Sequence, residues 1–280
     1  MVEKNGTHKA GAIGVFDSGY GGLTVLSEIK SLLPGYDFIY LGDNARTPYG
    51  NRSFERVYEF TLEAVKWFFD QGCRLVILAC NTASAKALRS IQQIDLPRIN
   101  VNNRVLGVIR PTAENAAILS QSGHIGIMGT EGTIQSKSYD IEIKKLHPQI
   151  FVTGEACPMW VPLVENREYD KPGADYFVKK HIDNILSKDP LIDTIILGCT
   201  HYPLLIEKIK YFLPKEVRAI SQGSIIAESL RNYLKRHPET DVLCTKNGTT
   251  TYFTTDSPLK FKQQASIFLE EEIVAHYAYL

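Results

Sequence analysis

LVILACNTASA (residues 75–85) and TIILGCTHYPL (residues 194–204) are the two stretches that decide the fold. Each opens with four residues suited to a buried strand, continues with a small residue and a cysteine, and ends in polar residues typical of a turn. Short apolar runs that stop at turn residues indicate strands buried on both faces, as in parallel sheets. The near-repetition predicts two similar α/β domains that face each other across a cleft.

Three further apolar runs, at residues 13–16, 38–41 and 125–128, have the same character. Between the second of these and residue 75, the segment 53–71 places Val57, Phe60, Ala64 and Phe68 at spacings of three and four, and Gly72 follows as a stop signal. This segment predicts an amphipathic helix. Strands that alternate with helices predict βαβ units, so the expected fold class is α/β, with central parallel sheets flanked by helices.

Composition excludes several classes of protein. The 280 residues are 44% hydrophobic, which suits a substantial core and is more typical of two domains than of one. Lys+Arg and Asp+Glu both number 31, and no basic run marks a nucleic-acid or anionic lipid partner. We therefore expect a small-molecule substrate rather than nucleic acid or membrane.

The sequence also bears on the compartment. Residues 1–10 lack the apolar core of a secretory signal, and no run approaches the roughly 20 apolar residues of a membrane span, so we expect a cytoplasmic protein. The cysteines are odd in number, widely spaced and free of CxxC pairs, which predicts reduced thiols without zinc. They are Cys73, Cys80, Cys157, Cys199 and Cys244.

Three of the predicted strands run directly into polar turns. These turns are Phe16-Asp17-Ser18-Gly19, Ala79-Cys80-Asn81-Thr82 and Gly198-Cys199-Thr200-His201. Ligands of open parallel sheets bind at the carboxyl ends of the strands, where helix N-termini point into the crevice. These turns are therefore the first place to look for a site.

Cys80 and Cys199 are the strongest candidates for chemistry. A thiol with a pKa of about 8.5 is a poor base at neutral pH, but a helix N-terminus after each cysteine would favour the thiolate. Asn81, Thr82 and Thr200 offer hydrogen bonds, and His201 could transfer a proton near pH 7. One cysteine at a strand end is more often a small buried hydrophobe, whereas two in matching contexts favour function. Cys73 and Cys244 look structural.

Other polar segments are weaker candidates. Gly19, Gly21 and Gly22 after Asp17 would let backbone amides approach an anion, but the GxGxxG spacing is missing, and Asp17 could simply cap a helix. Threonine hydroxyls in the loops 46–50 and 129–133 suit a carboxylate ligand. Glu165 follows an apolar run, where partial burial would raise its pKa and let it shuttle protons.

Taken together, six motifs stand in the order and spacing of the glutamate racemases, within the aspartate/glutamate racemase family. They are FDSGYGGLTV, TPYG, CNTASA, GTEGTI, VPLVE and LGCTHYPLL, and the resemblance spans roughly residues 13–226. It implies an isomerase of two α/β domains with the active site in the cleft between them. Residues 1–104 and 220–280 would form a discontinuous domain A, and residues 105–219 would form domain B.

The resemblance also implies a reaction. L- and D-glutamate would be interconverted without a cofactor or metal, supplying D-glutamate for bacterial peptidoglycan. Cys80 would deprotonate D-glutamate and Cys199 would deprotonate L-glutamate from the opposite face of Cα. Asp17 would assist Cys80, and His201 with Glu165 would assist Cys199.

The substrate's amino and carboxylate groups would be held by residues of the same motifs, with Asp17 and His201 also in contact. These residues are Ser18, Pro48, Tyr49, Gly50, Asn81, Thr82, Thr130, Thr133 and Thr200. The chain departs from the family's pattern at residues 45–47 and 109–112, neither of which contains a thiol. The tail from about Arg231 matches no motif, and its segment 258–271 predicts a helix that could pack on domain A or on another subunit, so a homodimer stays open.

Three alternatives remain at this point. A racemase for another amino acid, such as aspartate, would differ only in its side-chain pocket. A Cys-His hydrolase or transferase would use Cys199 as a nucleophile oriented by His201 and would need one thiol. A non-catalytic binding protein would hold an amino acid in the cleft and exchange no protons.

Overall fold

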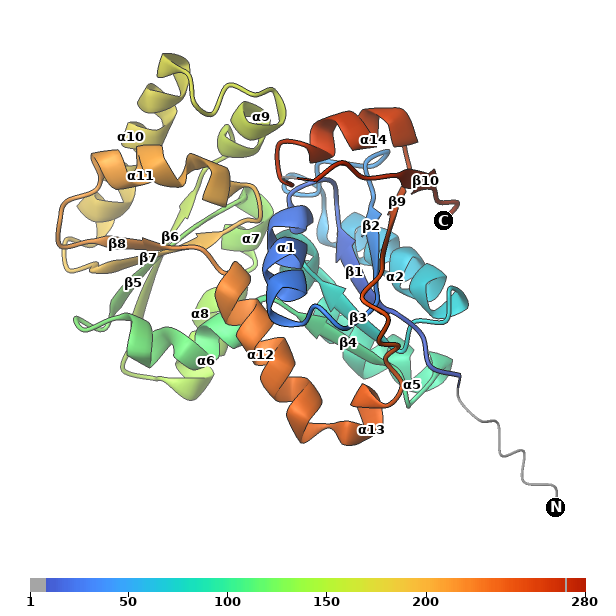
Figure 1. Cartoon of the computed structure of the whole chain (residues 1–280). Helices are drawn as coiled ribbons and strands as arrows, with labels where there is room; N and C mark the ends of the chain where they lie inside the picture. Colours follow the sequence, from blue (N-terminus) through green and yellow to red (C-terminus); the bar gives the residue numbers. More distant parts are fainter. Residues whose placement is uncertain (1–8, 270) are drawn as a thin grey trace.

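The computed structural model describes residues 9–269 and 271–280 and has two α/β domains, each built on a parallel sheet (Figure 1). The predicted fold class is confirmed. Within these residues, no helix combines the length and the apolar character needed to span a membrane. Most of the N-terminal segment in which we expect no secretory signal, residues 1–8, lies outside the described residues.

Sheet A has six parallel strands in the order β10-β9-β2-β1-β3-β4. Its strands are β1 (Ile13–Asp17), β2 (Phe38–Gly42), β3 (Leu75–Leu78), β4 (Arg104–Gly107), β9 (Thr250–Thr254) and β10 (Ala275–Tyr277). Sheet B has four parallel strands in the order β6-β5-β7-β8. Its strands are β5 (His124–Gly129), β6 (Phe151–Ala156), β7 (Thr194–Gly198) and β8 (Arg218–Ile220). The five strands predicted from apolar runs are β1, β2, β3, β5 and β7.

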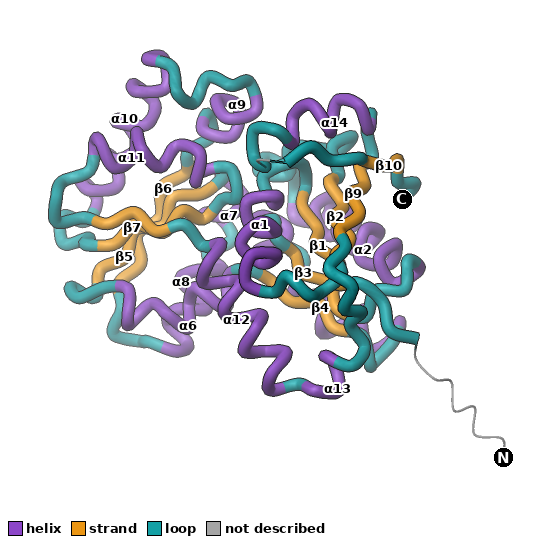
Figure 2. The backbone as a smooth tube through the Cα atoms, in the orientation of Figure 1, coloured by secondary structure: helices purple, strands orange, loops and turns teal. Residues whose placement is uncertain are grey.

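Helices cover both faces of each sheet (Figure 2). In the first part of the chain they are α1 (Gly22–Leu32), α2 (Phe54–Asp70), α3 (Asn81–Lys86), α4 (Leu88–Ser90), the π-helical turn η1 (Ile91–Asp95) and α5 (Leu96–Ile99). The middle of the chain contributes α6 (Ile109–Leu119), α7 (Glu131–Gln135), α8 (Ser138–Leu146), α9 (Trp160–Glu165) and α10 (Pro172–Lys188). The remainder are the 3₁₀ turn η2 (Tyr202–Leu205), α11 (Ile206–Phe212), α12 (Gly223–Arg236), α13 (Pro238–Asp241) and α14 (Pro258–Ala265).

The alternation of side chains along each strand separates two apolar cores per sheet. In β7, Ile195 and Leu197 pack with α10, while Ile196 packs on the opposite face with α6 and α8. In β3, Ile77 packs with α1 and α12, and Val76 packs with α2. Complete burial of such a side chain contributes roughly 1.5–3 kcal/mol. Residues 75–78 of β3 and 195–197 of β7 are therefore apolar at successive positions, because both faces of each sheet are covered.

Helix α2 shows why the predicted amphipathic segment folds as it does. Ser53 caps its N-terminus by accepting a hydrogen bond from the backbone N–H of Arg56 at 3.3 Å. Val57, Ala64 and Phe68 are buried against sheet A. Gly72 follows the helix with φ +90°, a conformation that favours glycine. The helix therefore begins and ends where the sequence predicts.

The C-terminal helix is shorter than predicted. Helix α14 ends at Ala265 instead of continuing to position 271, and the chain turns at residues 266–268. Phe261, Ala265 and Leu269 are buried in the core that α1 and α12 share with sheet A. A turn brings Leu269 back to this core, which explains why the helix stops. The prediction that this segment could pack on domain A is confirmed.

The strand order reverses at one point in each sheet. In sheet A the chain passes from β1 to its neighbour β2 and then crosses back to β3, the neighbour of β1 on the other side. In sheet B it likewise passes from β5 to β6 and then to β7, on the other side of β5. Such reversals open a crevice at the carboxyl ends of the strands. The predicted domain boundaries at 104/105 and 219/220 fall within β4 and β8, and where the two domains divide stays a prediction.

Candidate active site

Both candidate thiols line one cavity of about 250 Å³ between the domains. Cys80 follows β3 and Cys199 follows β7, so each lies beside a point of strand-order reversal. They belong to separate apolar cores and are 6% and 7% exposed, with their remaining surface on the shared cavity. The cavity is partly open, and its volume suits a ligand smaller than a typical drug molecule.

Most of the residues predicted to contact substrate reach this cavity. Those in its wall are Ser18, Pro48, Tyr49, Gly50, Cys80, Asn81, Thr82, Thr130, Glu165, Cys199, Thr200 and His201. Asp17 and Thr133 do not line it, but both hydrogen-bond residues that do. Thr47, whose hydroxyl was expected to suit a carboxylate, also lines it, and six further lining residues were not expected in the site: Asn51, Glu131, Cys157, Pro158, Val161 and Pro162.

Cys80 is held as a neutral thiol. Its sulfur accepts a hydrogen bond from the backbone N–H of Ala83 at 3.5 Å, as the N-cap of α3, and donates to Ser18 Oγ at 3.5 Å. Burial raises the pKa of Cys80 to about 12, and the charge of Asp17 acts in the same direction. Burial therefore outweighs the helix N-terminus, in contrast to the prediction that a thiolate would be favoured there.

Cys199 lies in a different environment. Its Sγ is 3.9 Å from Nδ1 of His201, and Nε2 of the same imidazole is 3.0 Å from Oε1 of Glu165. Burial lowers the pKa of His201, but the hydrogen bonds with Cys199 and Glu165 outweigh it and raise that pKa to about 10. The imidazole is therefore cationic at neutral pH instead of titrating near pH 7.

Asp17 forms hydrogen bonds to residues of both domains behind the cavity wall. Its Oδ1 accepts a hydrogen bond from the backbone N–H of Gly19 at 3.0 Å, and its Oδ2 accepts one from Thr200 Oγ1 at 3.5 Å. The carboxyl is completely buried, and burial raises its pKa although His201 opposes the shift. Asp17 therefore shapes its own turn and also contacts the turn that carries Cys199.

A cluster of hydroxyl groups crosses the cleft. Thr82 Oγ1 lies 2.9 Å from Thr130 Oγ1 and 3.4 Å from Thr133 Oγ1. Thr130 caps α7 by accepting from the backbone N–H of Thr133 at 3.3 Å. Asn81 Oδ1 is held by the hydroxyl of Tyr139 at 2.5 Å. These groups provide donors and acceptors for a polar ligand beside Cys80.

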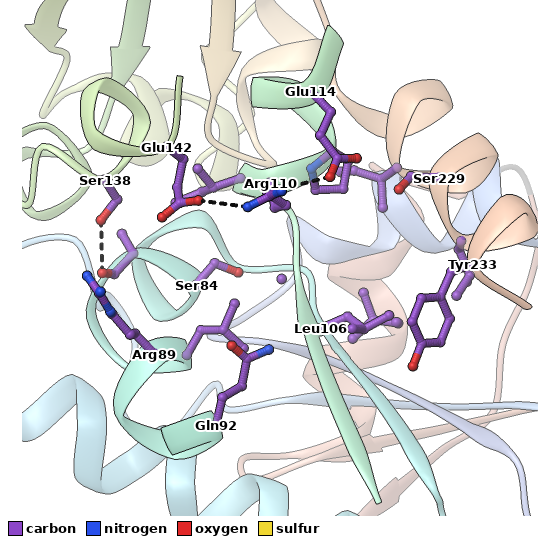
Figure 3. A pocket seen from close by; sticks show the side chains of 18 of the residues that line it. Ser84, Arg89, Gln92, Leu106, Arg110, Glu114, Ser138, Glu142, Ser229 and Tyr233 are labelled. Carbon is purple, nitrogen blue, oxygen red and sulfur yellow. Dashed lines mark hydrogen bonds and ion pairs between the residues drawn. The ribbon is translucent and has the colours of Figure 1, made fainter. Parts of the chain in front are cut away.

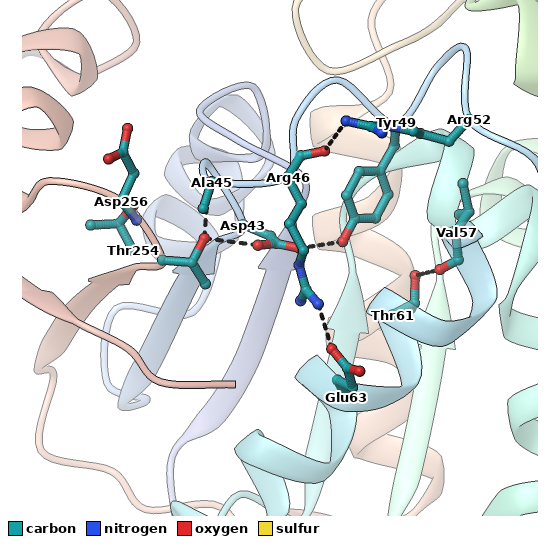
Figure 4. A network of polar contacts seen from close by, with 11 residues as sticks. Asp43, Ala45, Arg46, Tyr49, Arg52, Val57, Thr61, Glu63, Thr254 and Asp256 are labelled. Atoms are coloured by element: carbon teal, nitrogen blue, oxygen red, sulfur yellow. Dashed lines mark hydrogen bonds and ion pairs between the residues drawn. The ribbon is translucent and has the colours of Figure 1, made fainter.

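A buried carboxylate, Asp43, fixes the loop that carries Tyr49 (Figure 4). The Tyr49 hydroxyl donates to Asp43 Oδ2 at 2.5 Å, and Arg46 Nε donates to the same oxygen at 2.7 Å. Thr255 donates to Asp43 Oδ1 at 2.8 Å and accepts from the backbone N–H of Ala45 at 3.0 Å. The C-terminal segment thus helps to shape the wall of the cavity.

Two glycines permit the domains to approach each other. A Cβ on Gly21 would lie 2.3 Å from Thr200 Oγ1 and 2.4 Å from His201 Nδ1. A Cβ on Gly50 would lie 2.8 Å from Thr130 Cβ, and the Gly50 carbonyl accepts a hydrogen bond from the backbone N–H of Gly132 at 2.8 Å. Any side chain at these positions would push the two halves of the site apart.

Cys157 is the missed residue for which a signal existed. It directly follows the carboxyl end of β6, just as Cys199 directly follows β7 and Cys80 comes two residues after the end of β3. Burial raises its pKa well above the usual value, and its Sγ bonds the carbonyl of Glu155 at 3.7 Å. Among the described residues, no group of three or more His, Cys, Asp or Glu side chains is arranged to hold a metal ion.

A second cavity, of about 450 Å³, lies elsewhere between the domains (Figure 3). It contains no thiol. Three of its charged side chains pair with one another, since Arg110 contacts Glu114 at 2.8 Å and Glu142 at 3.5 Å. Its lining has neither the cysteines nor the histidine that distinguish the cavity of Cys80 and Cys199.

Comparisons with known proteins agree with this geometry. The family model described as Asp/Glu/Hydantoin racemase matches residues 13–230. A glutamate racemase of Geobacter metallireducens is 40% identical over 263 residues, 92% of each chain. A glutamate racemase isoform of Bacillus anthracis superimposes with a TM-score of 0.88 at 38% identity, covering 98% of this chain and 99% of that one.

Two further structures extend the comparison. The Francisella tularensis glutamate racemase in complex with D-glutamate has a TM-score of 0.84 at 31% identity, covering 96% of this chain and 97% of that one. An aspartate racemase of Picrophilus torridus, at 17% identity and a TM-score of 0.52, shares the fold alone. The resemblance stated from the motifs is thus confirmed, and the chain belongs to the Asp/Glu/Hydantoin racemase family.

Proposed function

We propose that the chain interconverts L- and D-glutamate by moving the Cα proton between two thiols, with no bound cofactor. The single observation that carries the proposal is that Cys80 and Cys199 line one small cavity from strand ends of different domains. Inversion needs a base on one face of the carbon and an acid on the other. A single general base could not supply both.

In the proposed reaction the two thiols start in different protonation states. At neutral pH Cys80 carries its proton, because burial raises its pKa to about 12. Cys199 faces the cationic imidazole of His201, and we propose that it acts as the base in this direction. In this state the free protein is ready for L-glutamate. Cys199 takes the Cα proton, the electron pair passes into the carboxylate as an enediolate, and Cys80 protonates the opposite face to give D-glutamate.

The reverse reaction uses the same groups in exchanged states. Cys80 must then act as the base, and Cys199 as the acid. Ionised Cys80 is costly in this buried setting, so we propose that the substrate's ammonium group and the hydrogen bonds from Ser18 and Ala83 stabilise it. Asp17 would assist Cys80, and the His201–Glu165 pair would assist Cys199.

Substrate would be held by the polar groups that surround the thiols. The hydroxyls of Thr82 and Thr130, with Thr133 behind them, suit a carboxylate, as do the backbone amides of the turn at Ser18. Pro48, Tyr49, Gly50, Asn81 and Thr200 would complete the contacts. The names of the relatives, and the D-glutamate complex of the Francisella tularensis enzyme, support glutamate over other amino acids.

We further propose that the D-glutamate supplies peptidoglycan synthesis in the bacterial cytoplasm. Glutamate racemases of several bacteria are similar over most of their length, which supports this role. A homodimer remains part of the proposal, through the C-terminal segment or another surface.

The test of substrate is a comparison of L-glutamate and L-aspartate with the purified chain, without added cofactor, by circular dichroism of the amino acid. We expect the L-glutamate signal to decay to zero as the racemate forms, and L-aspartate to stay optically active. Racemisation of aspartate at an equal rate would refute the glutamate assignment. No racemisation of either would favour a binding protein.

A further inference from the structure

The C-terminal segment reaches the catalytic side of domain B. The ring of Phe268 lies perpendicular to the His201 imidazole, with 5.6 Å between centroids and 90° between planes. Phe268 packs partly buried against two cores, the one that α1 shares with sheet A and the one that α10 shares with sheet B. It therefore links the two domains beside His201.

An aromatic row fixes the position of Phe268. Tyr20, in the turn after Asp17, stacks on Phe268 with centroids 6.3 Å apart and planes inclined by 14°. Tyr20 also packs on Phe261 of α14, with centroids 5.4 Å apart. The row thus runs from the buried face of α14 to His201. The turn that follows the shortened α14 therefore places an aromatic ring against a residue of the cavity wall.

The same segment contacts domain B a second time. Arg167, two residues after Glu165, has φ 58°, the left-handed region that residues other than glycine rarely adopt. Its Nη2 donates to the carbonyl of Gln263 at 3.1 Å and to Ser266 Oγ at 3.4 Å. Residues 263–268 therefore contact His201 directly and also contact Arg167, two residues after Glu165.

We propose that Phe268 is a positioning residue that holds the His201 imidazole with one nitrogen toward Cys199 and the other toward Glu165. An imidazole can rotate about its Cβ–Cγ bond, and other rotations would lose one or both contacts. A perpendicular ring packed against it leaves little room for such rotation. The inference rests on the proposed function, in which His201 serves Cys199.

The test compares Phe268→Ala and Phe268→Leu with Leu269→Ala in the full chain. Leu269 is the matched control, because it is buried in the domain A core next to Phe268 in sequence. We expect Phe268→Ala to lower kcat about 10- to 100-fold with KM nearly unchanged, since a small misplacement of a catalytic group has effects of this size. Leu269→Ala should lower the melting temperature and leave kcat within about 3-fold of wild type.

A double-mutant cycle with His201→Asn separates positioning from general packing. If Phe268 acts through His201, Phe268→Ala should add little to the loss caused by His201→Asn. If Phe268→Ala lowers kcat by the same factor in the wild-type and His201→Asn proteins, the proposal is overturned. An unchanged kcat in a folded Phe268→Ala variant would also overturn it. If Phe268→Ala does not fold, Phe268→Leu takes its place in the cycle.

NMR of the His201 ring nitrogens provides a readout that does not depend on turnover. We expect Phe268→Ala to change the pKa of His201, because both the burial that lowers it and the hydrogen bonds that raise it alter when the ring rotates, while Leu269→Ala leaves it unchanged. An unchanged His201 titration in Phe268→Ala would contradict the inference. An inactive wild-type chain would instead refute the proposed function, so the two failures are distinguishable.

Discussion

Nε2 of His201 lies 3.0 Å from Oε1 of Glu165, although the two are 36 positions apart in the chain. The contact forms because α9 ends at Glu165 and the turn after β7 brings His201 to the same place. It leaves Nδ1 facing Cys199 at 3.9 Å. Glu165 therefore influences the sulfur through the imidazole between them.

The first prediction concerns the pH dependence of stability. Because the pKa of His201 rises from 6.5 to about 10 on folding, its contribution to the free energy of unfolding is complete below pH 6.5 and is lost as the pH rises toward 10. Denaturant titrations between pH 6 and 8.5 should show this decline in wild type and a shallower one in Glu165→Gln and His201→Asn. NMR should find His201 protonated at pH 8 in wild type. A neutral imidazole at pH 7 would contradict the arrangement.

The second prediction concerns the close approach of the domains. Gly21→Ala places a methyl group against Thr200 and His201, and we expect kcat/KM to fall at least about 10²-fold because the catalytic groups are displaced. The control is Gly35→Ala, whose Cβ meets no atom within 4 Å. It should keep wild-type activity. Equal kcat/KM values of the two variants would contradict this prediction, because they would show that the domains can move apart without loss of activity.

The third prediction concerns the loop of Tyr49. Asp43→Asn keeps the size of the side chain but replaces an acceptor with a donor that faces the Tyr49 hydroxyl and Arg46. We expect a loss of about 1–3 kcal/mol in unfolding free energy and a raised KM, because the loop no longer holds its position. Glu63→Gln is the control, since Glu63 contacts only the outer end of Arg46 and is half exposed. Steady-state kinetics and urea titrations measure both effects. A Glu63→Gln effect as large as that of Asp43→Asn would contradict the role of Asp43.

Much of the fold follows from the sequence because buried parallel strands have a distinctive pattern. The runs that precede Cys80 and Cys199 are almost entirely apolar, with Thr194 the one polar residue, and the carboxyl ends of these strands lie at the cavity. The end of α14 could not be predicted, because local helical periodicity continues past Ala265 while tertiary packing turns the chain there.

The site was partly predictable for a similar reason. Motifs at strand ends identified the thiols, yet the protonation of Cys80 and His201 depends on burial and on partners distant in the chain. The role of Asp43 likewise rests on Thr255, 212 residues away. Cys157 shares the position after a strand with the other two cysteines, but Pro158 follows it in place of a polar pair, so it carried only part of their pattern.

The most direct measurement of the two-thiol claim follows L-glutamate by NMR in D₂O with the purified chain and no cofactor. If the acid and the base are different sulfurs, the D-glutamate formed first carries deuterium at Cα while the remaining L-glutamate still keeps its protium. Cys80→Ser and Cys199→Ser should each slow racemisation by about 10²- to 10⁴-fold, and Cys73→Ser should not. D-glutamate that retains the original protium, or activity that survives in the Cys80→Ser, Cys199→Ser double variant, would contradict the account.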